Sequence, residues 1–81
     1  MTAHRPGARQ RAILAAMRDG ATLYNLSGVW YSIVEDCTTY QPSATCRGLF
    51  EHGYIYSDQE VQATGGTRWR YVLTMKGQGT R

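Results

Sequence analysis

A strand–turn–strand unit is predicted by residues 22–34, which read TLYNLSGVWYSIV. The two runs 22–26 and 29–34 are rich in the β-branched and aromatic residues that favour strands. Between them stand Ser27 and Gly28, which are typical turn residues. The centre of the chain is therefore expected to fold as a β-hairpin.

A helix is predicted before this hairpin, over residues 8–19, because strong helix formers there carry an apolar stripe at helical spacing. The stripe consists of Ile13, Leu14 and Met17. Gly20 supplies the stop signal. Residues 1–7 contain Pro6 and Gly7 and show no apolar period, so we expect them to form a flexible basic arm.

A second helix is predicted in the middle of the chain. Residues 35–41 are polar and lack a period, so they are expected to form a loop. Pro42 suits the first turn of the helix that follows, and Ser43 offers a capping hydroxyl. This helix is expected to end at His52.

Two further strands complete the prediction. The first begins at Tyr54, a glycine turn follows at residues 65–66, and the returning strand alternates through residues 68–73. A loose tail is expected at residues 77–81. The chain is thus predicted to be one α+β domain, residues 8–76, with the element order α-β-β-α-β-β.

The composition indicates one small globular domain with a modest positive charge. The chain has 81 residues, with nine Lys and Arg against six Asp and Glu, which gives a net charge of +3. Such a charge permits a polyanionic partner without demanding one. No apolar run approaches the roughly 18 residues of a membrane helix, and the N-terminus lacks the apolar core of a signal peptide. We therefore expect a cytoplasmic protein that does not associate with membranes.

The sequence shows no catalytic or metal-binding pattern. Cys37 and Cys46 lack the close spacing of structural zinc sites, and neither His4 nor His52 has a nucleophilic partner at a telling spacing. Two free thiols are the expectation for an intracellular chain, and a disulfide the alternative for a secreted one. We expect no enzyme, no cofactor and no metal.

Two segments of the second half match a known pattern. Residues 42–55 read PSATCRGLFEHGYI, and residues 70–77 read RYVLTMKG. They resemble the winged-helix family, a variant of the helix-turn-helix class, in which a capped recognition helix leads through a glycine into a β wing. The resemblance implies a small winged-helix-like fold. Winged helices usually carry one more helix where residues 22–34 predict a hairpin, and small phage and prophage proteins show this shorter pattern.

The resemblance implies a small DNA-binding protein, a phage or bacterial transcriptional regulator that acts as a homodimer on double-stranded DNA. The residues expected to contact DNA are Ser43, Thr45, Arg47, Arg68, Arg70, Arg9 and Arg11. Ser43, Thr45 and Arg47 stand on the predicted recognition helix, whose outward face suits a protein partner equally well. The two wing arginines either clamp phosphates or form a solvated outer face.

A different class of function stays open beside DNA binding. The chain holds six tyrosines and two tryptophans, which are too many for a core of this size. Surface aromatic residues favour protein interfaces. The alternative is therefore a phage-type inhibitor or adaptor that binds a host protein through Tyr24, Trp30 and Tyr31 on the predicted hairpin.

Overall fold

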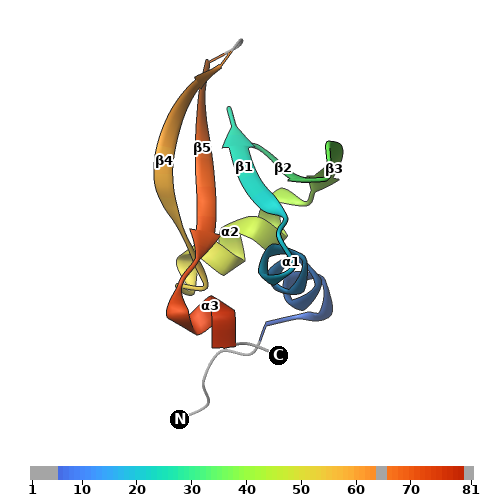
Figure 1. The fold of residues 1–81 in the computed structure, drawn as a ribbon. Helices are drawn as coiled ribbons and strands as arrows, with labels where there is room; N and C mark the ends of the chain where they lie inside the picture. Colours follow the sequence, from blue (N-terminus) through green and yellow to red (C-terminus); the bar gives the residue numbers. More distant parts are fainter. Residues whose placement is uncertain (1–5, 64–65, 80–81) are drawn as a thin grey trace.

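The computed structural model describes residues 6–63 and 66–79. Five antiparallel strands form one sheet in the order β3-β2-β1-β5-β4, and three helices gather at one end of it (Figure 1). In chain order the elements are α1 (Ala8–Arg18), β1 (Thr22–Leu26), β2 (Val29–Val34), β3 (Cys37–Gln41), α2 (Ser43–Glu51), β4 (Ile55–Ala63), β5 (Gly66–Leu73) and α3 (Met75–Gly79).

The predicted winged-helix-like fold, with the order α-β-β-α-β-β, is wrong. The order is α-β-β-β-α-β-β-α, and all five strands belong to a single sheet in which β1 lies between β2 and β5. The first hairpin is thus joined edge to edge with the second. The resemblance to the winged-helix family itself stays a prediction.

The first helix and the first hairpin form where the sequence predicted them. α1 ends one residue before the expected boundary at residue 19, and β1 and β2 have the expected bounds. Ser27 and Gly28 both adopt positive φ angles, 52° and 85°. Two consecutive residues in this conformation make the tight turn whose twist matches that of the flanking strands.

Strand β3 occupies residues that the sequence predicted as a loop. Glu35 and Asp36 have φ angles of 49° and 65°, so a second two-residue turn folds β3 back onto β2. β3 is an edge strand, and Cys37 to Tyr40 are exposed. A strand that buries neither face needs no apolar alternation, which is why periodicity could not reveal it.

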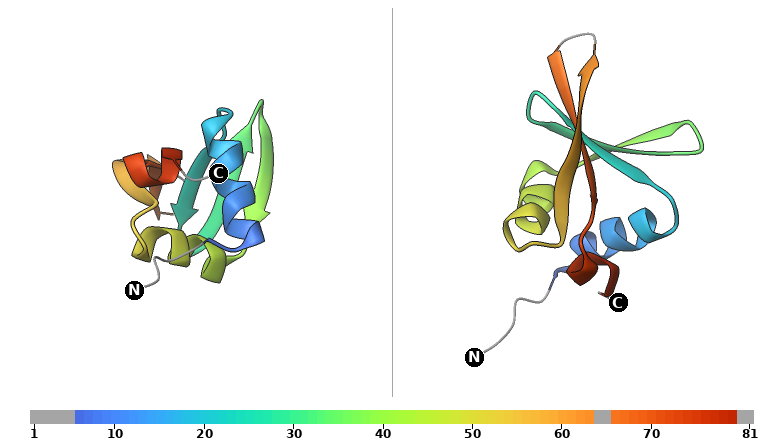
Figure 2. Two further views of the ribbon diagram at one scale, coloured as in Figure 1. Left: turned by 90° about the horizontal axis from the view of Figure 1, so that it is seen from below. Right: turned by 60° about the vertical axis from the view of Figure 1, so that its left-hand side comes forward.

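The hydrophobic core lies between the helices and one face of the sheet. α1 contributes Ile13 and Leu14, and α2 contributes Cys46 and Leu49. The strands meet them with Leu23, Trp30 and Ile55, and the ring of Trp30 lies 4.7 Å from that of Tyr71. The stripe predicted for the first helix is therefore confirmed as its buried side, with Ile13 and Leu14 buried and Met17 partly buried, whereas Phe50 of α2 is 48% exposed. Beyond this core the hairpin of β4 and β5 continues past the helices, and the sheet is strongly twisted (Figure 2).

A short third helix closes the lower end of the domain. α3 covers residues that the sequence assigned partly to a loose tail at 77–81, so the boundary expected at residue 76 falls inside a helix. Thr74 fastens its start by donating a hydrogen bond to the carbonyl of Gly53, at 2.6 Å. Within residues 6–63 and 66–79, no helix is long and apolar enough to cross a membrane.

The packing of α3 makes a first prediction about stability. Gly77 is buried, and a methyl group there would overlap the backbone carbonyl of Tyr54, whereas the same group at Gly79 would meet open space. Gly77→Ala should lower the free energy of unfolding by about 1–3 kcal/mol, and the matched Gly79→Ala should change it by less than about 0.5 kcal/mol. Urea unfolding followed by circular dichroism measures both. Equal effects would show that α3 does not depend on this contact.

Candidate functional site

The two faces of the sheet carry different side chains. The closed face packs against α1 and α2 through residues such as Leu23, Trp30 and Tyr71. The strand register and the alternation of side chains place a second set on the opposite side, which we call the open face. The open face includes Tyr24, Leu26, Val29, Tyr31, Ile33, Thr38, Tyr40, Tyr56, Arg68, Arg70 and Val72.

Three tyrosines form a row across the open face. The rings of Tyr24 and Tyr31, on β1 and β2, stack with their centroids 5.5 Å apart. The ring of Tyr40, on β3, lies 6.2 Å from that of Tyr31 and is tilted by 60°. Tyr40 is 73% exposed, so the end of the row leaves an aromatic face free for a planar group.

Arg68 lies beside this row and is held there by aromatic contacts. Its guanidinium carbon stands 4.2 Å from the centroid of Tyr24, and Nη1 donates a long hydrogen bond of 3.5 Å to the hydroxyl of Tyr31. This hydrogen bond raises the pKa of Arg68 above its already high ordinary value, so the charge is permanent. Within the described part of the chain no carboxylate lies within ion-pair distance of Arg68, and its Nε is buried without a hydrogen-bond partner.

Arg70, two residues along the same strand, differs from Arg68 because it is paired with a carboxylate. Its Nε and Nη2 donate hydrogen bonds of 3.0 and 2.5 Å to the two carboxylate oxygens of Asp58, which lies at a bulge in β4. This pairing lowers the pKa of Asp58, mainly through the hydrogen bond from Arg70. The carboxylate therefore stays ionised well into the acidic range, and it neutralises Arg70 at neutral pH.

The structure brings together four of the residues predicted from sequence. Arg68 and Arg70, predicted for DNA contact, share the open face with Tyr24 and Tyr31, which were predicted for a protein partner. Trp30, predicted beside those tyrosines, is only 7% exposed and belongs to the core. Trp30 is accordingly not part of the site.

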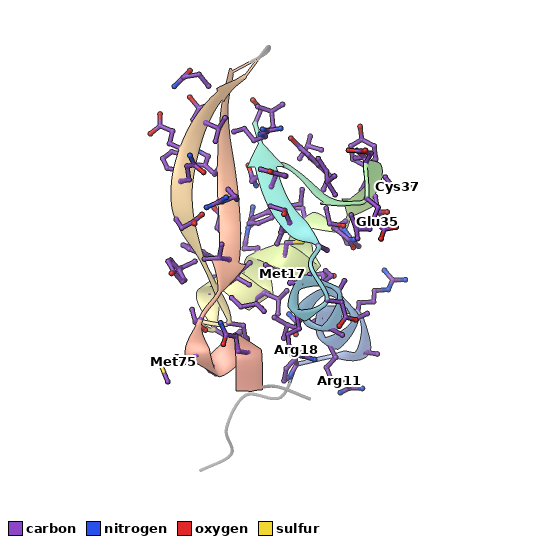
Figure 3. All side chains as sticks on the ribbon, viewed as in Figure 1. Arg11, Met17, Arg18, Glu35, Cys37 and Met75 are labelled. Atoms are coloured by element: carbon purple, nitrogen blue, oxygen red, sulfur yellow. The ribbon has the colours of Figure 1, made fainter. Side chains whose placement is uncertain are left out.

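The helical residues predicted for DNA contact lie apart from the open face. Ser43, Thr45 and Arg47 belong to α2, which packs on the closed face, so they and the wing arginines stand on opposite sides of the sheet. Arg9 and Arg11 belong to α1 on that same side. The Nη1 of Arg11 donates a hydrogen bond of 3.0 Å to the carbonyl of Pro6, and its side chain lies at the helical end of the molecule (Figure 3).

Two residues of the open face were missed by the sequence analysis. Tyr40 was assigned to a loop, and Tyr56 was placed on a strand without a role. Tyr56 is 49% exposed and pairs with Val72, so it flanks the arginines on the side opposite the tyrosine row. A period-2 count along residues 37–41 would have placed Tyr40 and Thr38 on one face, had that segment been recognised as a strand.

A hollow of about 310 Å³ lies elsewhere in the molecule, between α1 and the end of the β2–β3 hairpin. Its polar lining includes Ser32 and Gln41, and the Gln41 amide donates a 3.1 Å hydrogen bond to the Ser32 hydroxyl, which in turn contacts the carbonyl of Thr39 at 3.5 Å. Ala12 and Ala16 line the helical side. Arg9 is the one charged residue among the described residues of the lining, and Ser32 and Gln41 are hydrogen-bonded to each other, so the open face is the stronger candidate.

The two cysteines are free thiols in contrasting positions. Cys37 is exposed at the outer edge of β3, next to Glu35 (Figure 3), whereas Cys46 is fully buried in the core. Burial raises the pKa of the Cys46 thiol to about 11. In residues 6–63 and 66–79, no three His, Cys, Asp or Glu side chains gather in a way that could hold a metal ion.

This contrast predicts selective thiol labelling. At pH 8 the native protein should incorporate one equivalent of an alkylating reagent, at Cys37, because Cys46 is shielded and holds its proton. Unfolding in urea should expose the second thiol. Mass spectrometry of the labelled peptides distinguishes the two sites, and native labelling of Cys46 at a rate similar to Cys37 would contradict the packing of α2.

No protein family, no curated protein and no solved structure was found to match the chain.

Proposed function

We propose that this protein binds single-stranded nucleic acid on the open face of its sheet. The observation that carries the proposal is Arg68, a permanent cation held between the ring of Tyr24 and the hydroxyl of Tyr31 with no carboxylate partner among the described residues. A cation with free hydrogen-bonding capacity, surrounded by aromatic rings, is the combination that single-stranded nucleic-acid sites use.

The position of Arg68 favours a phosphate as its ligand. An arginine side chain loses considerable rotamer freedom when it is fixed, and the contact with Tyr24 has already fixed this one. Its buried Nε cannot be reached by solvent, so the outer nitrogens are the part that meets a ligand. The N–H donors of the planar guanidinium group are arranged so that they match the oxygens of a phosphate.

The exposed tyrosines supply the second requirement, which is a surface for bases. Tyr40, which is largely exposed, stands at one end of the open face, and Tyr56, which is half exposed, stands on the other side of the arginines. Every nucleobase has an aromatic face, so stacking on tyrosine binds single strands with little sequence preference. The bases of a duplex are already stacked on one another and do not offer these faces.

The width of the sheet also favours a single strand. Five strands spaced by about 4.8 Å span about 19 Å, which exceeds the major-groove width of about 12 Å that admits a helix or a two-stranded ribbon. The open face as a whole therefore cannot enter the groove of a duplex. Double-stranded DNA as the partner, read by Arg47 on α2, stays a prediction that the experiment below separates from this proposal.

A protein partner is the second candidate for the same surface. Aliphatic side chains adjoin the tyrosine row, among them Val29, which is 50% exposed at the turn between β1 and β2. An exposed face that combines aliphatic and aromatic side chains is typical of a protein interface. This candidate corresponds to the inhibitor or adaptor predicted from the number of aromatic residues.

The binding proposal is tested with a labelled mixed-sequence oligonucleotide of about 15 nucleotides, followed by fluorescence anisotropy. Affinity should fall about two- to threefold between about 50 and 200 mM salt, as the phosphate contact of Arg68 requires while Arg70 is paired with Asp58. Arg68→Ala should weaken binding about tenfold and reduce the salt dependence, because one phosphate contact is lost. Tyr40→Ala should also weaken binding about tenfold through lost stacking.

The matched control is Arg47→Ala, which removes one exposed arginine from the opposite side of the sheet. It should leave single-strand affinity within about twofold of the parent value. A larger loss with Arg47→Ala than with Arg68→Ala, or tighter binding to the duplex of the same sequence, would replace the open face with α2 as the nucleic-acid surface. No binding of either form at tens of micromolar would leave the protein partner as the remaining candidate.

The ion pair of Arg70 predicts a variant that binds more tightly. Asp58 competes with phosphate for Arg70, so Asp58→Asn should strengthen single-strand binding about two- to fivefold at neutral pH. The parent protein should gain the same increment in affinity on acidification. The pKa of Asp58 is lowered, so its carboxylate stays ionised and pairs with Arg70 until the pH falls through that pKa. Asp58→Asn should show no such acid gain in the anisotropy assay. Equal affinities for the two proteins at neutral pH would mean that Arg70 does not contact the ligand.

A further inference from the structure

The two edges of the sheet differ in how they are protected. The β4 edge has a bulge between Ser57 and Gln59 and carries the acidic residues Asp58 and Glu60. Bulges and charges are the usual devices that prevent an edge strand from pairing with another chain. Strand β3, at the other edge, has neither: its sequence is CTTYQ, it is uncharged, and it has no register shift against β2.

The register of the β2–β3 hairpin shows which backbone groups of β3 face outward. The two-residue turn makes Val34 and Cys37 a hydrogen-bonded pair, and such pairs recur at every second residue. Thr39 and Gln41 therefore direct their N–H and C=O groups toward β2. Thr38 and Tyr40 direct theirs away from the sheet. Pro42 follows directly and has no N–H, so the free edge is limited to these two residues.

We propose that this edge pairs with the β3 edge of a second copy of the chain, antiparallel and about a two-fold axis. Thr38 of each copy lies opposite Tyr40 of the other, and these two pairs together form four backbone hydrogen bonds. Thr39 lies opposite Thr39 of the second copy, on the axis. The result is a continuous ten-stranded sheet. The pairing is self-complementary. A two-fold rotation places the outward N–H and C=O groups of Thr38 in one copy opposite those of Tyr40 in the other, and the reverse pair forms at the same time.

The side chains support a second copy as the occupant. Thr38, Thr39 and Tyr40 have high strand propensity and are exposed in one chain, and pairing gives them the cross-strand neighbours that sheets favour. Tyr40 and Thr38 lie on the open face, so the tyrosine rows of the two copies join across the axis. Figure 3 shows Cys37, the first residue of β3, at the outer margin of the molecule. The inference uses only the edge geometry and does not rest on nucleic-acid binding.

The pairing is tested by sedimentation equilibrium of the full chain without nucleic acid, over about 10–500 μM, the range expected for a small interface. The mass should rise from 9.1 kDa toward twice that value as concentration increases. Thr38→Pro removes only an outward N–H and should abolish the rise, since proline is tolerated on a free edge. Thr38→Val keeps the N–H and the strand propensity and should dimerise like the parent.

A cross-link provides a test that does not depend on the proline variant folding. Directly opposed residues that are not hydrogen-bonded have Cα atoms about 4.5 Å apart, which lies within the range of a disulfide. With Cys37 replaced by Ser, Thr39→Cys should form a disulfide-linked dimer under mild oxidation. Glu35→Cys in the same background places an exposed thiol in the turn, away from the axis, and should remain monomeric.

Each outcome decides the proposal. A mass that rises for the parent and for Thr38→Val but not for Thr38→Pro, together with a Thr39→Cys dimer, supports the two-fold pairing. A mass that stays at 9.1 kDa over the whole range overturns it, as does equal cross-linking of Thr39→Cys and Glu35→Cys. These results are independent of the anisotropy assay. A dimer that binds no oligonucleotide would overturn only the binding proposal, and a monomer that binds one would overturn only the pairing proposal.

Discussion

The pairing of β1 with β5 determines which side chains of the two hairpins share the open face. It joins two hairpins that each form from neighbouring residues, and it fixes Leu23 opposite Tyr71 and Tyr24 opposite Arg70. Because successive side chains alternate between faces, a slip of one residue would move Tyr71 out of the core and Arg68 into it. The apolar contacts of Leu23 and Tyr71 with the helices make that slip unfavourable. The same contacts thereby hold Arg68 beside Tyr24 on the opposite side.

The parts of the fold that depend on neighbouring residues could be predicted from the sequence, and the parts that join distant segments could not. The apolar stripe of α1 and the Ser27-Gly28 turn each act within a few residues. Strand β3 lacks such a signal, because its side chains are exposed on both faces and its turn uses Glu35 and Asp36 instead of glycine. The position of β1 between β2 and β5 depends on contacts across more than 40 residues, which no local pattern records.

Four residues of the candidate site were predictable from the sequence, but the surface that they share was not. The alternation predicted along residues 68–73 agrees with the register, which places Arg68 and Arg70 on one face and Trp69 and Tyr71 on the other. Alternation within one strand does not show which of its faces will lie on the same side of the sheet as a given face of the neighbouring strand. The resemblance to a winged helix predicted a DNA contact through Arg47 on α2. The structure places Arg47 on the side of the sheet away from both arginines of β5. Pairing thus unites tyrosines and arginines that had been assigned to two separate functions.

The hairpin of β4 and β5 extends beyond the region that the helices cover (Figure 1). In its outer part, where Gln62 pairs with Thr67 and Ala63 with Gly66, β5 has no pairing with β1, and neither Gln62 nor Thr67 belongs to the core. Segments of this kind open locally at a lower free energy than the core, so their amide hydrogens exchange with solvent sooner. The chain therefore combines a stable base around Leu14, Leu23 and Leu49 with an arm that can adjust its twist without unfolding the domain.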